Sequence, residues 1–215
     1  MSIYGLILGI CFVIGITFFQ KNNLVIPKKL EIKFLFGLLI SAIIGARIYS
    51  IINYWSYFSQ NPLQILNFRG GGLGIFGGLV FGILFILVFS KIKNIPFLKI
   101  TNTIVPIIPL CQSLGRFGNF FNHEIYGTNG QPVWLYESIF MFILFLIFKK
   151  VKTHQTAYYL LGYGIIRFIL EFIRTDTIKI YFLSLGQVLS LLFILFSFII
   201  IKYENSSNKS RFNHH

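Results

Sequence analysis

Seven long apolar stretches divide this chain of 215 residues. A membrane-spanning helix needs about 20 consecutive apolar residues, because it must cross the hydrocarbon core with its backbone polar groups paired internally. The chain is 55% hydrophobic and only 12% charged, whereas a soluble domain carries about 25% charged residues. We therefore predict an all-α polytopic membrane bundle of about seven transmembrane helices. The expected spans are Ile3–Phe19, Phe34–Tyr54, Leu73–Phe89, Thr101–Phe121, Trp134–Phe148, Thr156–Arg174 and Leu183–Lys202.

The two weakest spans are the fourth, which contains Pro106 and Pro109, and the fifth, which is short. The first span lacks both a basic flank before it and a small-residue cleavage site after it, so we expect a retained helix and not a signal peptide. Residues 1–203 are expected to form a single transmembrane catalytic domain. Residues 204–215 are polar and are expected to form a disordered cytoplasmic tail.

Lysine and arginine alternate between the predicted loops and give the topology. Thirteen of the 19 basic residues fall in the first, third and fifth loops and the tail, and four fall on the other side. Because cytoplasmic loops are enriched in basic residues, this predicts an outside N-terminus and a cytoplasmic C-terminus. The net charge of +13 therefore reads as a topology signal. A nucleic-acid surface would instead cluster these residues on a soluble fold.

The expected outer end carries charges that a span does not normally hold. Arg167 and Glu171 are four residues apart in the sixth span, and Glu137 opens the fifth. Residues at this spacing share a helix face. Ionisable groups within spans are retained for pairing or for function. A structural ion pair and a functional site both remain open for Arg167 and Glu171. The other charges at this end are Arg47, Arg69, Arg116, Glu124, Arg174 and Asp176.

Glycines cluster at the start of the third span. Gly72, Gly74 and Gly77 formally match a dinucleotide-binding fingerprint, but no βαβ unit surrounds them and we exclude that function. Gly74, Gly78 and Gly82 recur at every fourth position. They either permit close helix packing or let the backbone approach a phosphate group at a helix start.

The segment from residue 112 to residue 127 concentrates polar side chains directly after an apolar run. Arg116, Asn119, Asn122, His123 and Glu124 fall within nine positions, and glycines flank the arginine. A solvated loop cap is one interpretation. The other is a set of donors that converge on a ligand near the membrane boundary.

These residues resemble the prolipoprotein diacylglyceryl transferases of bacterial inner membranes. Collinear motifs cover nearly the whole chain, and the family has seven spans with the same expected topology. The matching motifs are Tyr4-Gly-Leu, Gly45-Ala-Arg47, Gly71-Gly72 to Gly77-Gly78-Leu79, Gly115-Arg116-Phe-Gly118-Asn119-Phe-Phe-Asn122-x-Glu124-x-x-Gly127, Leu135-Tyr136-Glu137, Gly162-Tyr-Gly164-Ile-Ile-Arg167-Phe-Ile-Leu-Glu171-Phe-Ile-Arg174 and Gly186-Gln187-Val-Leu-Ser190.

The resemblance implies transfer of the diacylglyceryl group of phosphatidylglycerol to the lipobox cysteine of a prolipoprotein signal peptide, with release of glycerol-1-phosphate. It implies no cofactor and no metal, and it places the site towards the outer face of a multi-pass inner-membrane protein. We expect Arg116 and Arg167 to hold the headgroup, and Glu137 and Glu171 to orient them. Further residues expected to bind phosphatidylglycerol are Tyr4, Asn119, Asn122, Glu124, Gly77 and Gly78.

The chain departs from the family pattern in three places. Phe76 stands where the family has a histidine that is proposed to activate the thiol, and Gln131-Pro132 replaces a His-Pro pair. The external head between Gly127 and Pro132 is minimal. Conversely, His123 stands where glycine is common. Because imidazole exchanges protons near neutral pH, His123 is a candidate catalytic base. A solvent-facing loop histidine, or a reaction that needs no protein base, are the alternatives.

Two other functions stay open at this point. A small transporter or channel also carries intramembrane charges and glycine-broken helices, although no internal repeat is evident here and the charges lie away from the expected midplane. A catalytically impaired relative that only binds lipid is the second, because of Phe76.

Overall fold

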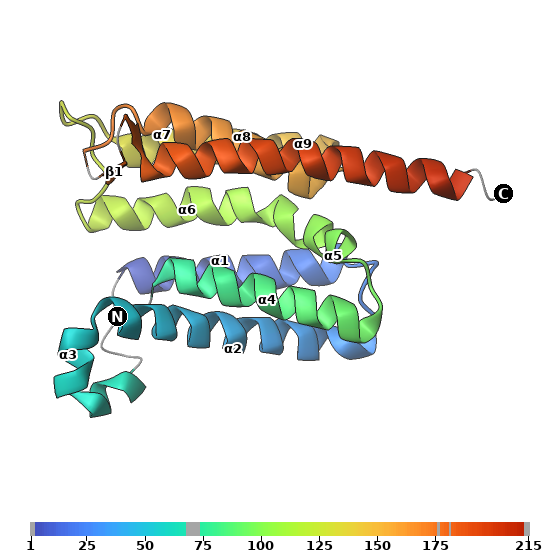
Figure 1. Cartoon of the computed structure of the whole chain (residues 1–215), viewed down its shortest axis with the longest axis horizontal. Helices are drawn as coiled ribbons and strands as arrows, with labels where there is room; N and C mark the ends of the chain where they lie inside the picture. Colours follow the sequence, from blue (N-terminus) through green and yellow to red (C-terminus); the bar gives the residue numbers. More distant parts are fainter. Residues whose placement is uncertain (1–2, 68–73, 176, 181, 213–215) are drawn as a thin grey trace. The chain divides into compact units, whose positions relative to one another are not determined.

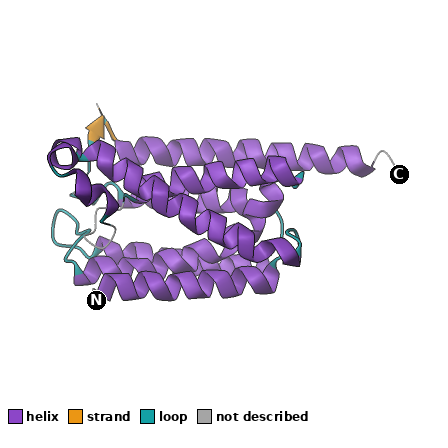
Figure 2. Cartoon of the chain, turned by 90° about the horizontal axis from the view of Figure 1, so that it is seen from below, coloured by secondary structure: helices purple, strands orange, loops and turns teal. Residues whose placement is uncertain are grey.

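The described part of the chain is mostly helical and contains one short strand pair, with loops between the helices (Figure 2). The computed structural model describes residues 3–67, 74–175, 177–180 and 182–212. The α-helices are α1 (Ile3–Asn22), α2 (Lys28–Asn53), α3 (Trp55–Gln60), α4 (Ile75–Lys93), α5 (Phe97–Ile104), α6 (Ile108–Phe121), α7 (Val133–Lys150), α8 (Gln155–Leu170) and α9 (Leu185–Phe212). Two 3₁₀ helices, η1 (Pro62–Leu66) and η3 (Val105–Ile107), and two antiparallel strands, β1 (Lys179–Ile180) and β2 (Leu183–Ser184), complete the described elements.

The chain divides into two compact units, and the single transmembrane catalytic domain expected for residues 1–203 stays a prediction. Unit 1 comprises residues 1–22 and 101–215, and unit 2 comprises residues 23–100. Within unit 1, α1 packs along α6, α6 along α7, α7 along α8 and α8 along α9 (Figure 1). Within unit 2, α2 packs along α4.

Among the described residues, five helical segments are long and apolar enough to cross a membrane. They are Ile3–Asn22, Lys28–Asn53, Ile75–Lys93, Phe97–Phe121 and Leu185–Ser206. The other two predicted spans correspond to α7, which carries Glu137 and ends in Lys149 and Lys150, and to α8, which has 16 residues. The all-α membrane bundle is thus confirmed, whereas the count of seven spans stays a prediction. Large apolar side chains such as Val13, Leu79 and Leu195 are exposed along these helices, as lipid contact requires.

Of the two weak spans, the fourth is interrupted and the fifth forms one continuous helix. Pro106 lies in η3, between α5 and α6, and Pro109 lies in the first turn of α6. A proline in the first turn removes no helical hydrogen bond, so the helix restarts there without penalty. The predicted fifth span forms α7 at full length.

The sixth predicted span is too long. We expect a helix to Arg174 from the sequence, but α8 ends at Leu170 and a turn follows. The chain leaves the helix because its backbone pairs with another loop. Gly127 and Arg174 form an antiparallel bridge, and the Thr128 N–H donates to the Ile173 carbonyl at 3.0 Å. Helix α9 in turn continues to Phe212, into the segment for which the sequence predicts disorder.

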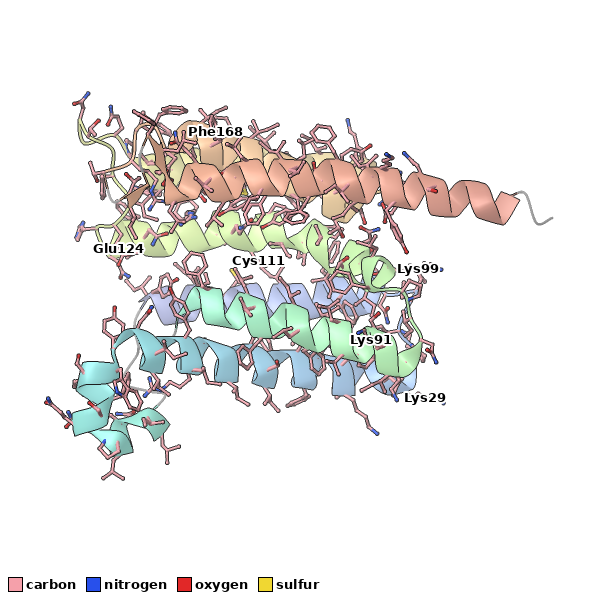
Figure 3. All side chains as sticks on the ribbon, in the orientation of Figure 1. Lys29, Lys91, Lys99, Cys111, Glu124 and Phe168 are labelled. Carbon is pink, nitrogen blue, oxygen red and sulfur yellow. The ribbon has the colours of Figure 1, made fainter. Side chains whose placement is uncertain are left out.

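Lysines gather at one end of each unit. Figure 3 shows Lys29, Lys91 and Lys99 at the end of unit 2 that is opposite α3. In unit 1, Lys21 lies in the last turn of α1, and Lys149 and Lys150 lie in the last turn of α7.

Aromatic and aliphatic side chains fill each core. In unit 2 the fully buried ring of Phe34 packs against Phe85 and Phe89, with ring centroids 5.8 and 4.8 Å away. In unit 1 the core is formed by Val105, Met141, Leu144 and Phe148, and partly buried Tyr159 and Tyr163 pack against it.

Candidate functional site

The candidate site lies at the end of unit 1 where α6 stops, α7 starts and α8 stops. Glu124 follows the last turn of α6, far from Cys111 in the first turn of that helix (Figure 3). Two buried serines fix α6 against α7 below this end, because the Ser113 and Ser138 hydroxyls lie 3.0 Å apart and Ser138 also donates to the Ser113 carbonyl at 2.9 Å. One turn further along α6 stands Arg116, opposite Glu137 on α7.

Glu137 joins the two arginines that the sequence singles out. Its side chain is fully buried, with 0% exposed. One carboxylate oxygen pairs with the Arg116 guanidinium, and the other lies 3.7 Å from Nη1 of Arg167. A buried carboxylate is stable only when cations and donors offset its lost hydration. The side chains of Arg116 and Arg167 are 21% and 19% exposed, so both arginines are partly accessible while Glu137 is not.

A polar chain continues from Arg116 to the surface. Arg116 Nη1 donates to Asn119 Oδ1 at 3.2 Å, and Asn119 Nδ2 donates to Glu124 Oε2 at 2.8 Å. Asn122 Nδ2 lies 3.4 Å from the other Glu124 oxygen, and the Glu124 N–H donates to the Asn119 carbonyl at 2.9 Å. In this series of hydrogen bonds Asn119 connects Arg116 to Glu124. The spacing of the residues in the sequence does not reveal this connection.

A second ion pair holds Arg167. Its Nη2 lies 2.9 Å from Glu171 Oε2, at the i, i+4 spacing expected from the sequence. Glu171 is also buried, and its other oxygen accepts a hydrogen bond from the Ser184 hydroxyl at 2.9 Å. Arg167 therefore contacts both Glu137 and Glu171, and each carboxylate has a further partner of its own.

The loop after α6 is short and rigidly bonded. The Gly127 N–H donates to the Gln131 carbonyl at 2.8 Å, and the Gly130 N–H donates to the Gly127 carbonyl at 2.9 Å. A side chain at Gly127 would collide with the Gln131 amide and the Ile173 carbonyl, so only glycine fits this crossing of two backbones. The sequence predicts a minimal external head in this segment, and the loop is indeed short; its place outside the membrane stays a prediction.

His123 occupies an exposed position in this loop. Its backbone has φ 56°, in the left-handed region, and its N–H donates to the Phe120 carbonyl at 3.1 Å. The Glu124 carboxylate beside it accepts from Asn119 and Asn122. The role of His123 as a base stays a prediction.

Tyr4 of α1 lies against the same end of α6. A side chain added at buried Gly118 would overlap the Tyr4 ring. Because Gly118 has no side chain, the Tyr4 ring of α1 can lie against α6 two residues away from Arg116.

Gly77, Gly78 and Phe76 belong to unit 2. A side chain at Gly77 would strike the Gly45 carbonyl, and one at Gly45 would strike the Gly77 carbonyl, so these two glycines allow close crossing of α2 and α4. Phe76 is exposed and contacts Tyr49, with ring centroids 6.1 Å apart. Contact of a phosphate group with Gly77 and Gly78 stays a prediction.

Arg47 has a structural environment in unit 2. It is buried, donates to the carbonyls of Gln64, Ile65 and Asn67, and lies over the Phe58 ring with Cζ 5.0 Å from the centroid. Its hydrogen bonds therefore hold residues 64–67, which follow α3, against α2. Of the other singled-out residues, Arg69, Gly71, Gly72 and Asp176 lie outside the described residues.

Sequence reasoning missed Ser184 as a contact of Glu171. The pattern Ser184-x-x-Gln187 ahead of an apolar run is a capping-box signature. This pattern could have drawn attention to Ser184 in the sequence. The site contains two groups suited to bind an anion, the guanidiniums of Arg116 and Arg167, and each pairs with a buried carboxylate. Within the described part of the chain, no cluster of three histidine, cysteine or acidic residues is arranged to hold a metal ion.

Comparison with known proteins identifies the family. The sequence profile of the prolipoprotein diacylglyceryl transferase family matches residues 1–203. A phosphatidylglycerol–prolipoprotein diacylglyceryl transferase of Clostridioides difficile is 42% identical, over 78% of this chain and 75% of that protein. Proteins of the same name from Finegoldia magna and Clostridium novyi are 37% and 34% identical, over 96% and 97% of this chain and 90% and 93% of theirs. The resemblance seen in the motifs is thereby confirmed, and the chain belongs to the prolipoprotein diacylglyceryl transferase family.

Proposed function

We propose that this chain transfers the diacylglyceryl group of phosphatidylglycerol to the cysteine thiol of a lipobox peptide. Family membership over residues 1–203 supports the reaction class. The observation that carries the assignment of the site is the buried Glu137 carboxylate, which pairs with Arg116 on one oxygen and faces Arg167 on the other.

The chemistry explains why two arginines are useful. A thiolate attacks the glyceryl carbon, the carbon–sulfur bond forms and the carbon–oxygen bond to phosphate breaks. The thiol proton leaves to a base or to water. One negative charge on sulfur and one on the phosphodiester end as two charges on glycerol-1-phosphate. Guanidiniums stabilise this growing charge through paired N–H donors.

The remaining residues have distinct roles in this proposal. Glu137 and Glu171 orient the two arginines, because both carboxylates are buried. Glu137 lies between Arg116 and Arg167, and Glu171 pairs with Arg167 and is held on its other oxygen by the Ser184 hydroxyl. Asn119 and Asn122, linked through Glu124, extend the donor set towards the surface. Tyr4, beside Gly118, lines the same end of α6.

The proposed topology places this end on the outer side of the membrane. The basic loops and the lysine-rich helix ends support seven spans, an outside N-terminus and a cytoplasmic C-terminus. Lipid then reaches the arginines laterally within the outer leaflet, and the tethered signal peptide reaches them from outside. Cysteine accessibility tests this, because a cysteine at Asn129 is expected to react with an impermeant reagent in whole cells and one at Lys152 is not.

Reconstitution tests the function directly. Purified chain in vesicles that contain phosphatidylglycerol is mixed with a lipobox peptide, and thioether formation and glycerol-1-phosphate release are measured together. Equal amounts of both products are expected. A folded preparation that binds phosphatidylglycerol but yields neither product would overturn the proposal in favour of an impaired lipid-binding relative. A peptide whose cysteine is replaced by serine is the matched control.

A further inference from the structure

Helix α9 begins in a buried capping box that adjoins the candidate site. The Gln187 N–H donates to the Ser184 hydroxyl at 3.1 Å, and the Ser184 N–H donates to the Gln187 side-chain oxygen at 3.0 Å. This reciprocal pair satisfies two backbone donors at the start of the helix. Both side chains are buried, so the Ser184 hydroxyl is fixed in position by the backbone of α9.

The capping box also fixes the direction of the hydroxyl. A serine oxygen has one proton and two acceptor sites. Because Ser184 Oγ already accepts from Gln187, its proton is free for Glu171 Oε1, which lies 2.9 Å away. The other oxygen of Glu171 lies 2.9 Å from Nη2 of Arg167. The hydroxyl therefore holds the carboxylate on the side opposite the guanidinium.

Gly186 provides the space that Glu171 occupies. A side chain at Gly186 would overlap the Glu171 carboxylate and lie 2.7 Å from its Oε2. The obstructing group is the end of a flexible side chain, so an alanine at this position displaces the carboxylate and leaves the helix backbone in place. Space at Gly186 and the donor at Ser184 thus place the same carboxylate from two sides.

We infer that Ser184 and Gly186 are positioning residues: they set the Glu171 carboxylate, which in turn aims Arg167 at the phosphate of the lipid. This inference rests on the proposed function. It extends the site from α6, α7 and α8 to the start of α9. A sole role in starting α9 is the competing explanation for Ser184.

Three substitutions at Ser184 separate the two roles. Ser184→Ala removes both the helix cap and the donor to Glu171. Ser184→Gly removes the donor but keeps most of the cap, because glycine at this position costs only a few tenths of a kcal/mol compared with serine. Ser184→Thr keeps both. A positioning role predicts equal losses in the alanine and glycine variants and recovery in the threonine variant.

The measurement is kcat and KM for phosphatidylglycerol in reconstituted vesicles, together with thermal unfolding in detergent. We expect kcat/KM to fall about tenfold in Ser184→Ala and Ser184→Gly, as for loss of one hydrogen bond to a charged group. The kcat/KM of the Gly186→Ala variant is expected to fall by a similar factor, without a change in its unfolding temperature. Ser197→Ala is the control, because Ser197 is a buried serine of α9 whose hydroxyl donates to the Ile194 carbonyl of the same helix.

The outcomes distinguish this inference from the proposed function. If wild-type protein forms no thioether, the proposed function fails first. If wild type is active and Ser184→Gly matches it while Ser184→Ala is slow, Ser184 acts only as a cap and the inference is overturned. Wild-type kinetics in Gly186→Ala would overturn it as well.

Discussion

Replacing Glu137 by glutamine perturbs the centre of the site with the smallest possible change in shape. The carboxylate is fully buried, pairs with Arg116, and has its second oxygen 3.7 Å from Arg167. An amide of the same size keeps one oxygen acceptor but turns an NH₂ group towards the other guanidinium. Two donors then face each other, and neither arginine keeps a charged partner at this position.

The expected loss follows from the burial of the group. Removal of one partner from a buried ion pair costs about 3–5 kcal/mol. Because both arginine side chains are about one-fifth exposed and can regain some hydration, we take the lower end, about 3 kcal/mol. If the phosphate must then align the arginines itself, kcat/KM falls on the order of 100-fold. The shorter carboxylate of Glu137→Asp reaches one arginine and is expected to give an intermediate loss.

The assay is the initial rate of thioether formation at varied phosphatidylglycerol, with thermal unfolding measured on the same preparations. Glu31→Gln is the matched control. Glu31 is also a buried carboxylate, but it accepts from Asn23 at 2.6 Å within unit 2. The Glu31→Gln variant is expected to keep the kcat/KM of wild type. A folded Glu137→Gln protein with kcat/KM within about threefold of wild type would refute the orienting role, since that corresponds to well under 1 kcal/mol.

Three further predictions test other parts of the chain. If His123 is the base for the thiol, His123→Gln is slow and loses the rise in rate that deprotonation of the imidazole gives in wild type as pH increases; an unchanged pH–rate profile would exclude this role. Gly118→Ala forces its methyl group into the Tyr4 ring, so we expect about 1–3 kcal/mol of overpacking and slower transfer, and equal stability and rate would contradict the observed contact. Gly77→Ala meets the Gly45 carbonyl, a backbone group that cannot turn away, so the unfolding temperature in detergent should fall, and an unaltered temperature would disprove the close helix crossing.

The helical membrane character and the family could both be predicted from the sequence. Apolar stretches near bilayer length and a loop-by-loop alternation of lysines are local properties, readable without knowledge of packing. The motif around Arg116 and Glu124 identified the family, which the comparisons confirm. The spacing of Arg167 and Glu171 likewise predicted their pairing, because i, i+4 neighbours meet on any helix.

Other features of the site depended on contacts between segments far apart in the sequence. Glu137 required a cationic partner, but only the packing of α7 between α6 and α8 gave it two. The early end of α8 at Leu170 came from backbone pairing with the loop at Gly127. The apolar pattern of the sixth span gives no sign of this backbone pairing, because the partner loop lies far away in the sequence.

The environments of Arg47 and Ser184 were likewise decided by tertiary structure. The sequence grouped Arg47 with the outer charges, yet its guanidinium is used by backbone carbonyls of the segment after α2. Ser184 drew no attention in the sequence, yet its hydroxyl lies 2.9 Å from Glu171. The sequence alone determined which residue types occur near the membrane boundary. Only the fold decided which of them meet, because a buried charge takes its partner from whatever segment packing brings within hydrogen-bond distance.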